Sequence, residues 1–520
     1  MATMIQSWRR LDSVRRICLY QLPTIYSSTT FTRRNFSLES YHCSNVLSIE
    51  RMNQNIVKME YAVRGILPIR AMELARELKQ GVKKPFDSII FANIGDPHAM
   101  GQQPTTFFRQ VVACCDYPEL MNYNVFPNDV KRRASKLLSG IGGGGIGSYS
   151  DSQGPLKLRE DVAQSISDGK HDCNPDDIFL CAGATDGIKS VLHLIDFGQG
   201  KDRTGVLTPI PQYPLYSATL TEMNLVQIKY YLDEDNAWAI NVDSVHSIVQ
   251  KAREKCTPRA LVVINPGNPT GQCFSRRNVE DIVRYCSKEG LIIIADEVYQ
   301  ENIYAKGMQF HSFRKVANDI GLGPNDITIA SFYSASKGYM GECGYRAGFM
   351  ELYGLDPVVK NQFRKHRTAN LCSSNAGQVI MNCIVNPPKP GDESYELFAK
   401  ERENVLMSLT DKASKVSEAF NSIKGVKCNR IDGAMYAFPS ITLPKRAIEA
   451  ANSAKMAPDT FFCLDFLENT GICVVPGSGF GQREGTYHFR TTILPDTEKM
   501  QRFLVAFEDF YKKFVAKYTD

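Results

Sequence analysis

The chain has 520 residues, 43% hydrophobic and 22% charged, an ordinary globular composition that excludes fibrous and wholly disordered proteins. Its formal net charge is +5. Residues 1–38 carry this whole excess, because they contain six arginines, no lysine and a single acid, Asp12. The rest of the chain is neutral overall, so its charge gives no indication of a nucleic-acid partner.

Residues 1–36 have the composition of a transit peptide. Serine, threonine and arginine are frequent there, as in the segments that direct proteins into mitochondria or plastids. The string Arg34-Asn-Phe-Ser37 resembles a matrix-protease site with cleavage after Phe36. We therefore expect a mitochondrial-matrix protein. The alternatives are a plastid location, or an uncleaved basic tail on a cytoplasmic protein.

The fifteen cysteines and eight histidines predict neither a disulfide framework nor a metal site. No two cysteines have Cys-x-x-Cys spacing, so we expect reduced thiols buried as small apolar groups, and no bound metal. No apolar run approaches the roughly 20 residues of a membrane span, so no membrane association is expected.

The middle of the chain alternates short apolar runs with helical patterns such as residues 277–289. This alternation predicts an α/β fold with a mostly parallel sheet, in which ligands bind beyond the carboxyl ends of the strands. The predicted strands are residues 178–182, 205–208, 260–264, 291–295 and 327–331.

A second, smaller α+β domain is predicted after the proline- and glycine-rich segment 386–392. Apolar residues at helical spacing predict a long helix over 393–427. Short strands are expected at 435–438, 472–475 and 487–494. The predicted divisions are a transit peptide (1–36), an N-terminal segment that contributes to the small domain (37–115), a large domain (116–385) and the small domain (386–520).

Four segments after predicted strands carry side chains suited to chemistry. Lys337 follows the 327–331 run among small residues, where a lysine can become a nucleophile, although a solvated loop lysine would look the same. Asp296 follows the 291–295 run and would need a cation there, unless it caps a helix. Asn268 lies in a rigid turn with two prolines. Gly183-Ala-Thr-Asp-Gly187 precedes a helical pattern from Ile188, as in phosphate-binding turns and in ordinary tight turns.

The order of these segments resembles that of the class I/II pyridoxal-phosphate aminotransferases, over roughly residues 50–515. More narrowly, four strings resemble the alanine aminotransferase (glutamate–pyruvate transaminase) subfamily: residues 93–97, 149–154, 211–216 and 336–346. The resemblance implies the fold-type I architecture, with a mostly parallel seven-stranded sheet in the large domain. It also implies a homodimer with shared active sites and pyridoxal 5′-phosphate as cofactor.

The resemblance further assigns roles to individual residues of this sequence. Lys337 would bind the cofactor covalently and later carry a proton, and Asp296 would pair with the protonated pyridine nitrogen. Arg490 would clamp the substrate α-carboxylate against Gly95. The remaining cofactor contacts are a stacking ring (Tyr213), partners of the phenolic oxygen (Asn268 and Tyr299), phosphate ligands (Ala184, Thr185, Ser334 and Arg346), and a phosphate contact to the neighbouring subunit (Tyr149). No residue is identified for the side-chain carboxylate of glutamate.

The expected reaction is the reversible conversion of L-alanine and 2-oxoglutarate to pyruvate and L-glutamate. The resemblance implies a ping-pong sequence that passes through pyridoxamine phosphate. The first alternative is a glutamate–glyoxylate aminotransferase on the same scaffold. A pyridoxal-phosphate lyase and a non-catalytic regulator are further alternatives, the latter disfavoured because residues 1–50 offer no room for a DNA-binding module.

Overall fold

The computed structural model describes residues 47–61 and 65–519, so the predicted transit peptide and its cleavage site lie outside the described residues. The chain divides into two units, residues 1–52 and 53–520. Of the first unit, only the turn-rich segment 47–52 is described. The following paragraphs concern the second unit.

Its centre is a seven-stranded sheet with the order β1-β7-β6-β5-β4-β2-β3. Only β7 runs antiparallel to its neighbours, which confirms the prediction of a mostly parallel α/β sheet. The strands are β1 (Ile178–Cys181), β2 (Thr204–Ile210), β3 (Val226–Tyr231), β4 (Thr257–Ile264), β5 (Ile292–Asp296), β6 (Ile329–Ser334) and β7 (Gly348–Tyr353).

The sequence did not predict two of these strands. β3 lies at the edge of the sheet and alternates buried with exposed side chains, among them Lys229, so it lacks a continuous apolar run. β7 is wholly buried but carries Glu351 in its centre, which pairs with Arg314 at 3.2 Å. β6 also reaches Ser334, three residues beyond its predicted end, because it continues to pair with β7.

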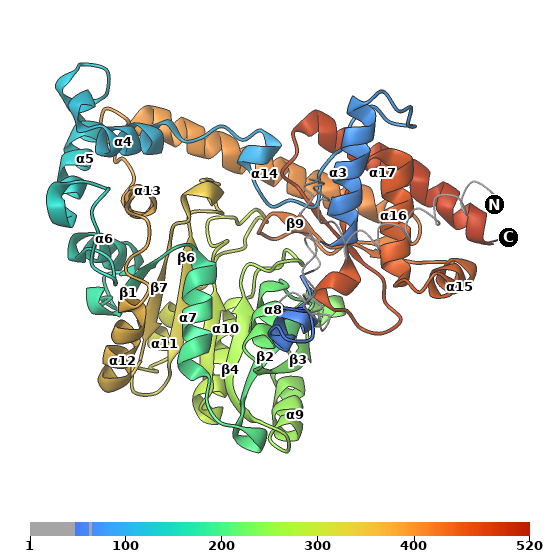
Figure 1. Ribbon diagram of the computed structural model, residues 1–520, viewed down its shortest axis with the longest axis horizontal. Helices are drawn as coiled ribbons and strands as arrows, with labels where there is room; N and C mark the ends of the chain where they lie inside the picture. The colour runs from blue at the N-terminus through green and yellow to red at the C-terminus, as the bar shows by residue number, and fades with distance from the viewer. Residues whose placement is uncertain (1–46, 62–64, 520) are drawn as a thin grey trace, which may run out of the picture. The chain divides into compact units, whose positions relative to one another are not determined.

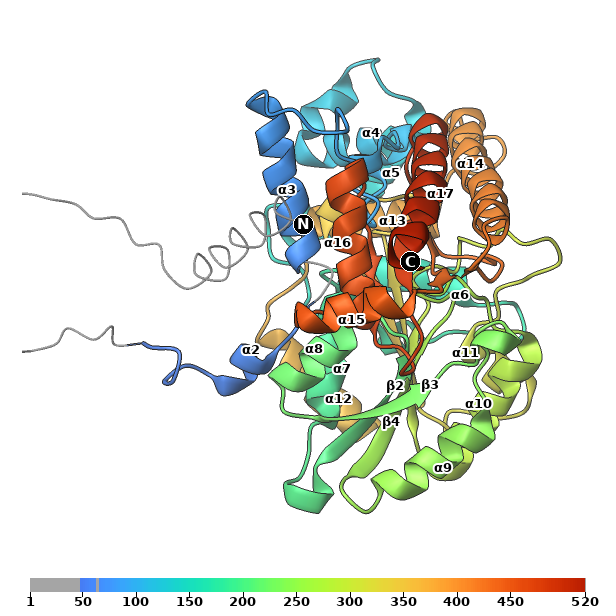
Figure 2. The ribbon, with the colours of Figure 1, turned by 90° about the vertical axis from the view of Figure 1, so that its right-hand side faces the viewer.

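Helices cover both faces of this sheet. Figure 2 shows α7, α8 and α12 on one side of the strands and α9, α10 and α11 on the other. Two separate apolar clusters fill these two interfaces, as expected for strands that are buried on both faces. The covering helices are α7 (Ala184–Ile195), α8 (Leu215–Glu222), α9 (Val242–Ala252), α10 (Arg276–Glu289), α11 (Phe313–Asp319) and α12 (Pro357–Thr368).

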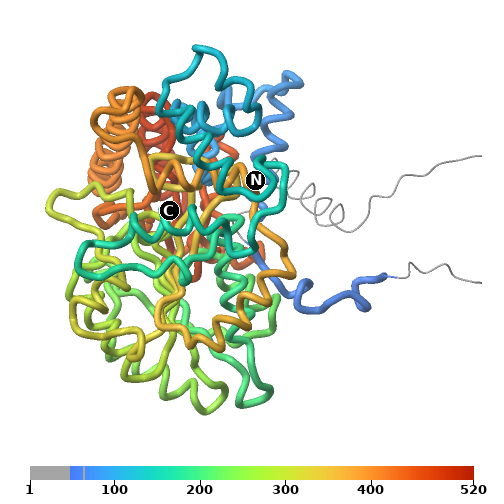
Figure 3. The backbone as a smooth tube through the Cα atoms, turned by 90° about the vertical axis from the view of Figure 1, so that its left-hand side faces the viewer, coloured from blue at the N-terminus to red at the C-terminus, as the bar shows by residue number. Residues whose placement is uncertain are grey.

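Segments from both ends of this unit pack together above the sheet. α3 lies beside α16, which separates it from α17 in Figure 2, and Ile90 forms a parallel bridge with Ile472 (Figure 1). Figure 3 shows the chain of α4 next to that of α13, and these two helices contact each other. The other helices are α2 (Gln54–Lys58), α3 (Ile66–Lys79), α4 (Thr106–Asp116), α5 (Asn128–Gly140), α6 (Leu156–Ile166), α13 (Asn375–Val385), α14 (Tyr395–Asn421), α15 (Lys445–Ser453), α16 (Pro458–Thr470) and α17 (Thr497–Thr519).

The long predicted helix is shorter than expected. α14 ends at Asn421, whose side chain exchanges hydrogen bonds with the backbone of Cys428. Gly425 has a left-handed φ of 91°, which suits glycine and turns the chain into a short strand. The short strands of this part are β8 (Val426–Lys427), β9 (Tyr436–Ala437), β10 (Ser440–Ile441), β11 (Val475–Pro476) and β12 (Phe489–Thr492). The predicted domain boundaries stay a prediction.

A cluster of buried phenylalanines holds β12 in place. The Phe489 ring lies 5.1 Å from that of Phe507 and packs near Phe420 at 5.7 Å, centroid to centroid. Phe462 joins the cluster from α16 and is fully buried. Because side chains alternate along a strand, Phe489 enters this cluster and the next residue, Arg490, points to the other side.

Within the described residues, no helix is both long enough and apolar enough to cross a bilayer.

We expect Phe462→Ala to lower the free energy of unfolding by about 3–5 kcal/mol, because it removes a buried ring and leaves a cavity. Chemical denaturation of the full chain measures this loss. Val505→Ala is a matched control on α17, since Val505 is 58% exposed, and it should change stability by less than about 0.5 kcal/mol. Equal unfolding midpoints for the two variants would contradict the central position of Phe462.

Candidate active site

A cavity of about 680 Å³ opens where β4, β5 and β6 end. This is the edge at which parallel sheets bind ligands. The cavity gathers residues from far apart in the chain, and eleven of the twelve predicted site residues line it: Gly95, Ala184, Thr185, Tyr213, Asn268, Asp296, Tyr299, Ser334, Lys337, Arg346 and Arg490.

Lys337 lies in the tight turn that follows β6. The amide of Gly338 donates to Asn302 Oδ1 at 2.8 Å and anchors this turn. The Lys337 amine donates to the carbonyl of Gly95 at 2.9 Å and lies 5.7 Å from the ring centre of Tyr299. The lysine is therefore a cavity residue and not a solvated loop lysine.

Asp296 is the last residue of β5, with only 5% of its surface exposed. The Tyr216 hydroxyl donates to Oδ2 at 2.9 Å, while Oδ1 has no hydrogen-bond partner among the described residues. Burial raises the pKa of Asp296 to about 6, although the Tyr216 hydroxyl opposes this shift. An unpaired carboxylate oxygen in a buried cavity suits a protonated ring nitrogen, as the pyridoxal-phosphate prediction requires.

The predicted phosphate turn is the beginning of a helix. α7 starts at Ala184, four residues earlier than predicted, and Gly183 precedes it with a φ of 83°. The first-turn N–H groups of a helix lack partners within the helix, and its N-terminus attracts anions. Asp186 is an acidic residue of the first turn of α7. It accepts from Ala182 N at 3.0 Å and forms an ion pair with Arg367 at 2.8 Å.

Arg346 and Ser334 lie beside this helix start. Arg346 packs against Gly183 so closely that a Cβ at position 183 would lie 2.5 Å from its guanidinium nitrogen. It donates to the carbonyl oxygens of Cys343 at 2.8 Å and Ala182 at 3.3 Å. Both of these acceptors are neutral, so the positive charge of Arg346 is available to an anion at the start of α7.

Arg490, on β12, is buried in the cavity wall with 2% of its surface exposed. It donates to Asn268 Oδ1 at 3.1 Å and to the Asn93 carbonyl at 2.8 Å, and its Nε has no hydrogen-bond partner among the described residues. Neither partner carries a negative charge. A buried guanidinium is costly without an anion, so this arrangement suits a carboxylate ligand.

The two partners expected for the cofactor's phenolic oxygen also face the cavity. Asn268 must turn its amide oxygen to Arg490, because a guanidinium only donates, and the NH₂ group remains its only donor. The Tyr299 hydroxyl donates to that of Tyr436 at 3.3 Å, and burial raises the pKa of Tyr299 well above its ordinary value. The Tyr213 hydroxyl is 2.8 Å from that of Tyr61.

The structure does not bring Tyr149 into the cavity. Its side chain is 75% exposed, and its predicted contact is with a neighbouring subunit. That role stays a prediction.

Sequence reasoning assigned no role to several residues that line the cavity or support it. Tyr216 belongs to the segment 211–216, which resembles the family without indicating a role for this residue. Its hydroxyl donates a hydrogen bond to Asp296. Tyr436 comes two residues after Ala434, which has a left-handed φ of 60° that its residue type does not predict. Asn93 was quoted in the string 93–97, but only its backbone carbonyl contacts Arg490. Tyr61 and Cys343 also line the cavity.

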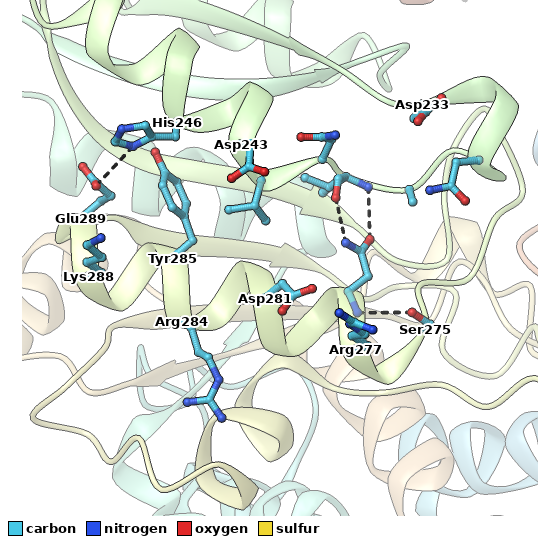
Figure 4. Close-up of a pocket in the computed structure, with 16 residues that line it drawn as sticks. Asp233, Asp243, His246, Ser275, Arg277, Asp281, Arg284, Tyr285, Lys288 and Glu289 are labelled. Carbon is cyan, nitrogen blue, oxygen red and sulfur yellow. Dashed lines mark hydrogen bonds and ion pairs between the residues drawn. The ribbon is translucent and has the colours of Figure 1, made fainter.

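A second hollow, of about 800 Å³, lies between α9 and α10 and contains none of the predicted site residues. Figure 4 shows acidic and basic side chains interspersed around it, and Asp281, Arg284 and Lys288 are drawn without a dashed line. His246 lies 3.5 Å from Glu289, and the Asn278 side chain exchanges hydrogen bonds with the backbone of Ile240. Its mixed charges favour no single ligand, so the first cavity is the candidate active site.

Comparison with known proteins gives a consistent result. The family model described as aminotransferase class I and II matches residues 118–507. Alanine aminotransferase 2 of Xenopus tropicalis is 53% identical over 484 residues, which cover 92% of this chain and 92% of that protein. Alanine aminotransferase 1 of Bos taurus is 52% identical over 477 residues, covering 91% of this chain and 96% of that protein. The solved structure of an alanine aminotransferase from Pyrococcus furiosus shares the fold, with a TM-score of 0.69 at 23% identity, and the match covers 89% of this chain and 100% of that one.

In protein free of cofactor, we expect Asp296→Asn to raise the free energy of unfolding at pH 8 by about 3 kcal/mol. The folded pKa of Asp296 is about 6, above its ordinary value of 3.8, so ionisation opposes folding increasingly from pH 4 to pH 6 and fully above that. The neutral amide avoids this cost. The gain should therefore shrink as the pH falls through 6 towards 4, where the carboxyl is protonated in both states.

Denaturant titrations at several pH values measure this dependence. A difference between the two proteins that stays constant from pH 5 to pH 8 would show that the altered Tyr216 hydrogen bond dominates instead of the buried charge.

Proposed function

The chain belongs to the class I and II aminotransferases, and we propose that it transfers an amino group reversibly between L-alanine and 2-oxoglutarate, giving pyruvate and L-glutamate. The relatives that match most of its length at about half identity are named alanine aminotransferases, which supports this substrate pair. The observation that carries the chemistry is the meeting of Lys337, Asp296 and Arg490 in one cavity.

The proposed cofactor is pyridoxal 5′-phosphate. When bound, it supplies an aldehyde that combines with amines and a ring that withdraws electrons from the substrate Cα. Asp296 would hold the ring nitrogen, because its Oδ1 lacks a partner among the described residues and the surrounding burial favours a cationic neighbour. The N-terminus of α7 and Arg346 would hold the phosphate.

Lys337 supplies the amine that moves a proton. Its amine already lies in the cavity, held by the carbonyl of Gly95, so little reorganisation is needed to reach a substrate bound beside Gly95. The other residues of the turn are small or anchored, which fixes the direction of the side chain.

Arg490 orients the substrate. Its planar guanidinium can bind a carboxylate through two parallel hydrogen bonds, which fixes the Cα relative to Lys337. Apolar side chains of α3, namely Pro68, Ile69 and Met72, line the same cavity. These side chains give the methyl group of bound alanine an apolar neighbour, and they reduce the access of water to the cavity.

We further propose a homodimer and a mitochondrial location. The dimer would bring the exposed Tyr149 to the phosphate of the partner's site, as the family resemblance implies. The location is supported by the arginine- and serine-rich composition of residues 1–36, which lie outside the described residues.

The function is tested by half-reactions of the purified enzyme with single amino acids, followed through the absorption of the bound cofactor. L-Alanine and L-glutamate should give the complete spectral change, and pyruvate and 2-oxoglutarate should reverse it. Lys337→Ala should show no turnover, a loss beyond the roughly 10²–10⁴-fold that one positioned proton carrier contributes. Borohydride should fix the cofactor to the wild type but not to this variant.

Two outcomes would count against these assignments. Faster reversal by glyoxylate than by pyruvate would favour the glutamate–glyoxylate enzyme. Covalent fixation of the cofactor in Lys337→Ala would remove that lysine from its role.

Arg490→Lys keeps the positive charge but loses the planar fork. We expect the KM values for alanine and for 2-oxoglutarate to rise by about 10–100-fold, the value of a charge-assisted hydrogen bond, while the cofactor stays bound. Steady-state kinetics and the absorption of the resting enzyme measure the two effects. Unchanged KM values for both substrates would overturn this role.

A further inference from the structure

Tyr436 lines the cavity, yet neither the sequence patterns nor the proposed reaction gives it a role. It begins β9, which pairs with β12, and its residue partner in the ladder is Thr492. Only 2% of its surface is exposed. Its ring lies 4.2 Å from the guanidinium carbon of Arg490, a stacked geometry that stabilises the cation.

The hydroxyl of Tyr436 reaches three other groups of the site. It is 3.3 Å from the Tyr299 hydroxyl, and both it and the Lys337 amine lie within 3.3 Å of the position that a Cβ of residue 95 would take. It also lies against Gly95, where an added Cβ would overlap the hydroxyl oxygen. The Lys337 amine donates to the carbonyl of the same glycine. One phenol therefore connects the lysine, Gly95 and the arginine.

The chemistry of a hydroxyl suits this position. The Gly95 carbonyl can only accept, so it cannot satisfy the lone pair of a neutral lysine amine. A phenol hydroxyl accepts from the ammonium form and donates to the neutral form. It can therefore hold the Lys337 side chain in one place while the amine gains and loses a proton.

The charges around Tyr436 make its hydroxyl easier to ionise. Burial opposes its ionisation, but the positive charges of Lys337 and Arg490 outweigh burial and hold the pKa of Tyr436 below its ordinary value. The other titratable groups that face it are Tyr299 and Tyr213.

We propose that Tyr436 is a positioning residue: its hydroxyl holds the free amine of Lys337 beside Gly95, and its ring supports Arg490. The hydroxyl thereby serves the proton transfer and the ring serves substrate binding. The proposal rests on the proposed function, because it assigns Tyr436 to the proton transfer and carboxylate binding of that reaction.

The two roles separate in a pair of variants. Tyr436→Phe keeps the ring and removes the hydroxyl, so kcat should fall by about 10–100-fold, the range of one hydrogen bond to a charged group, with KM changed less than about twofold. Tyr436→Ala also removes the ring beneath Arg490, so it should raise the KM for both substrates in addition. Tyr353→Phe is the matched control, since this buried tyrosine of β7 donates to Asn318 at 2.6 Å outside the cavity, and it should behave as wild type. A raised KM with unchanged kcat in Tyr436→Phe would overturn the proposal.

A second readout needs neither substrate nor turnover. Near-ultraviolet titration of the full chain, free of cofactor, should show one tyrosine that ionises at lower pH than the others. This phase should be absent from Tyr436→Phe and present in Tyr353→Phe. Its persistence in Tyr436→Phe would overturn the placement of the hydroxyl beside Lys337 and Arg490. The titration does not depend on which amino acid the enzyme accepts, so failure of the proposed function would leave it unchanged.

A third measurement tests the contact with Gly95 directly. Gly95→Ala should lower the thermal unfolding midpoint, because its methyl group meets the Tyr436 hydroxyl. Adding Tyr436→Phe removes the atom that clashes and should recover part of the loss, so the two effects should not add. Additive effects would overturn the proposed geometry.

Discussion

The structure depends on two charged groups that are buried in one cavity without partners of opposite charge. Asp296 has a carboxylate oxygen with no hydrogen-bond partner among the described residues, and Arg490 donates only to neutral amide oxygens. Such groups are costly in a protein interior unless a ligand completes them. A positively charged ring beside Asp296 and a carboxylate beside Arg490 would supply the missing partners. The cavity is therefore built for ligands that carry both charges, at the cost of stability in their absence.

The two charges are held by different parts of the fold. Asp296 ends β5, in the middle of a sheet that apolar clusters cover on both faces. Arg490 belongs to a strand of only four residues, and its position depends on Phe489 beside it, which is fixed in the phenylalanine cluster of α14, α16 and α17. Tyr436 joins the two sides, because its ring supports Arg490 while its hydroxyl faces Lys337 and Tyr299.

Sequence reasoning was reliable where one short segment contains the whole signal. The apolar runs located β1, β2, β4, β5 and β6, and Lys337 and Asp296 followed as residues at their ends. It failed where the signal lies in pairing between distant segments. β6 is longer than its apolar run because β7 continues to pair with it, and β7 itself was hidden by a glutamate whose charge is compensated by Arg314. The beginning of α7 was misplaced because Ala-Thr-Asp suits a turn as well as a helix start.

Short segments of the chain are enough to establish the α/β class, the order of the strand-end motifs and the resemblance to an aminotransferase family, because local hydrophobicity and short motifs are properties of neighbouring residues. The folded arrangement alone shows that Asp296 Oδ1 and the charge of Arg490 lack partners among the described residues, that Arg367 pairs with Asp186, and that Tyr436 lies against Gly95 near Lys337. These contacts join residues that lie 99 to 341 positions apart in the sequence, and the other two facts are absences of contact. Burial and pairing depend on which segments the folded chain brings together, and no local sequence pattern records that.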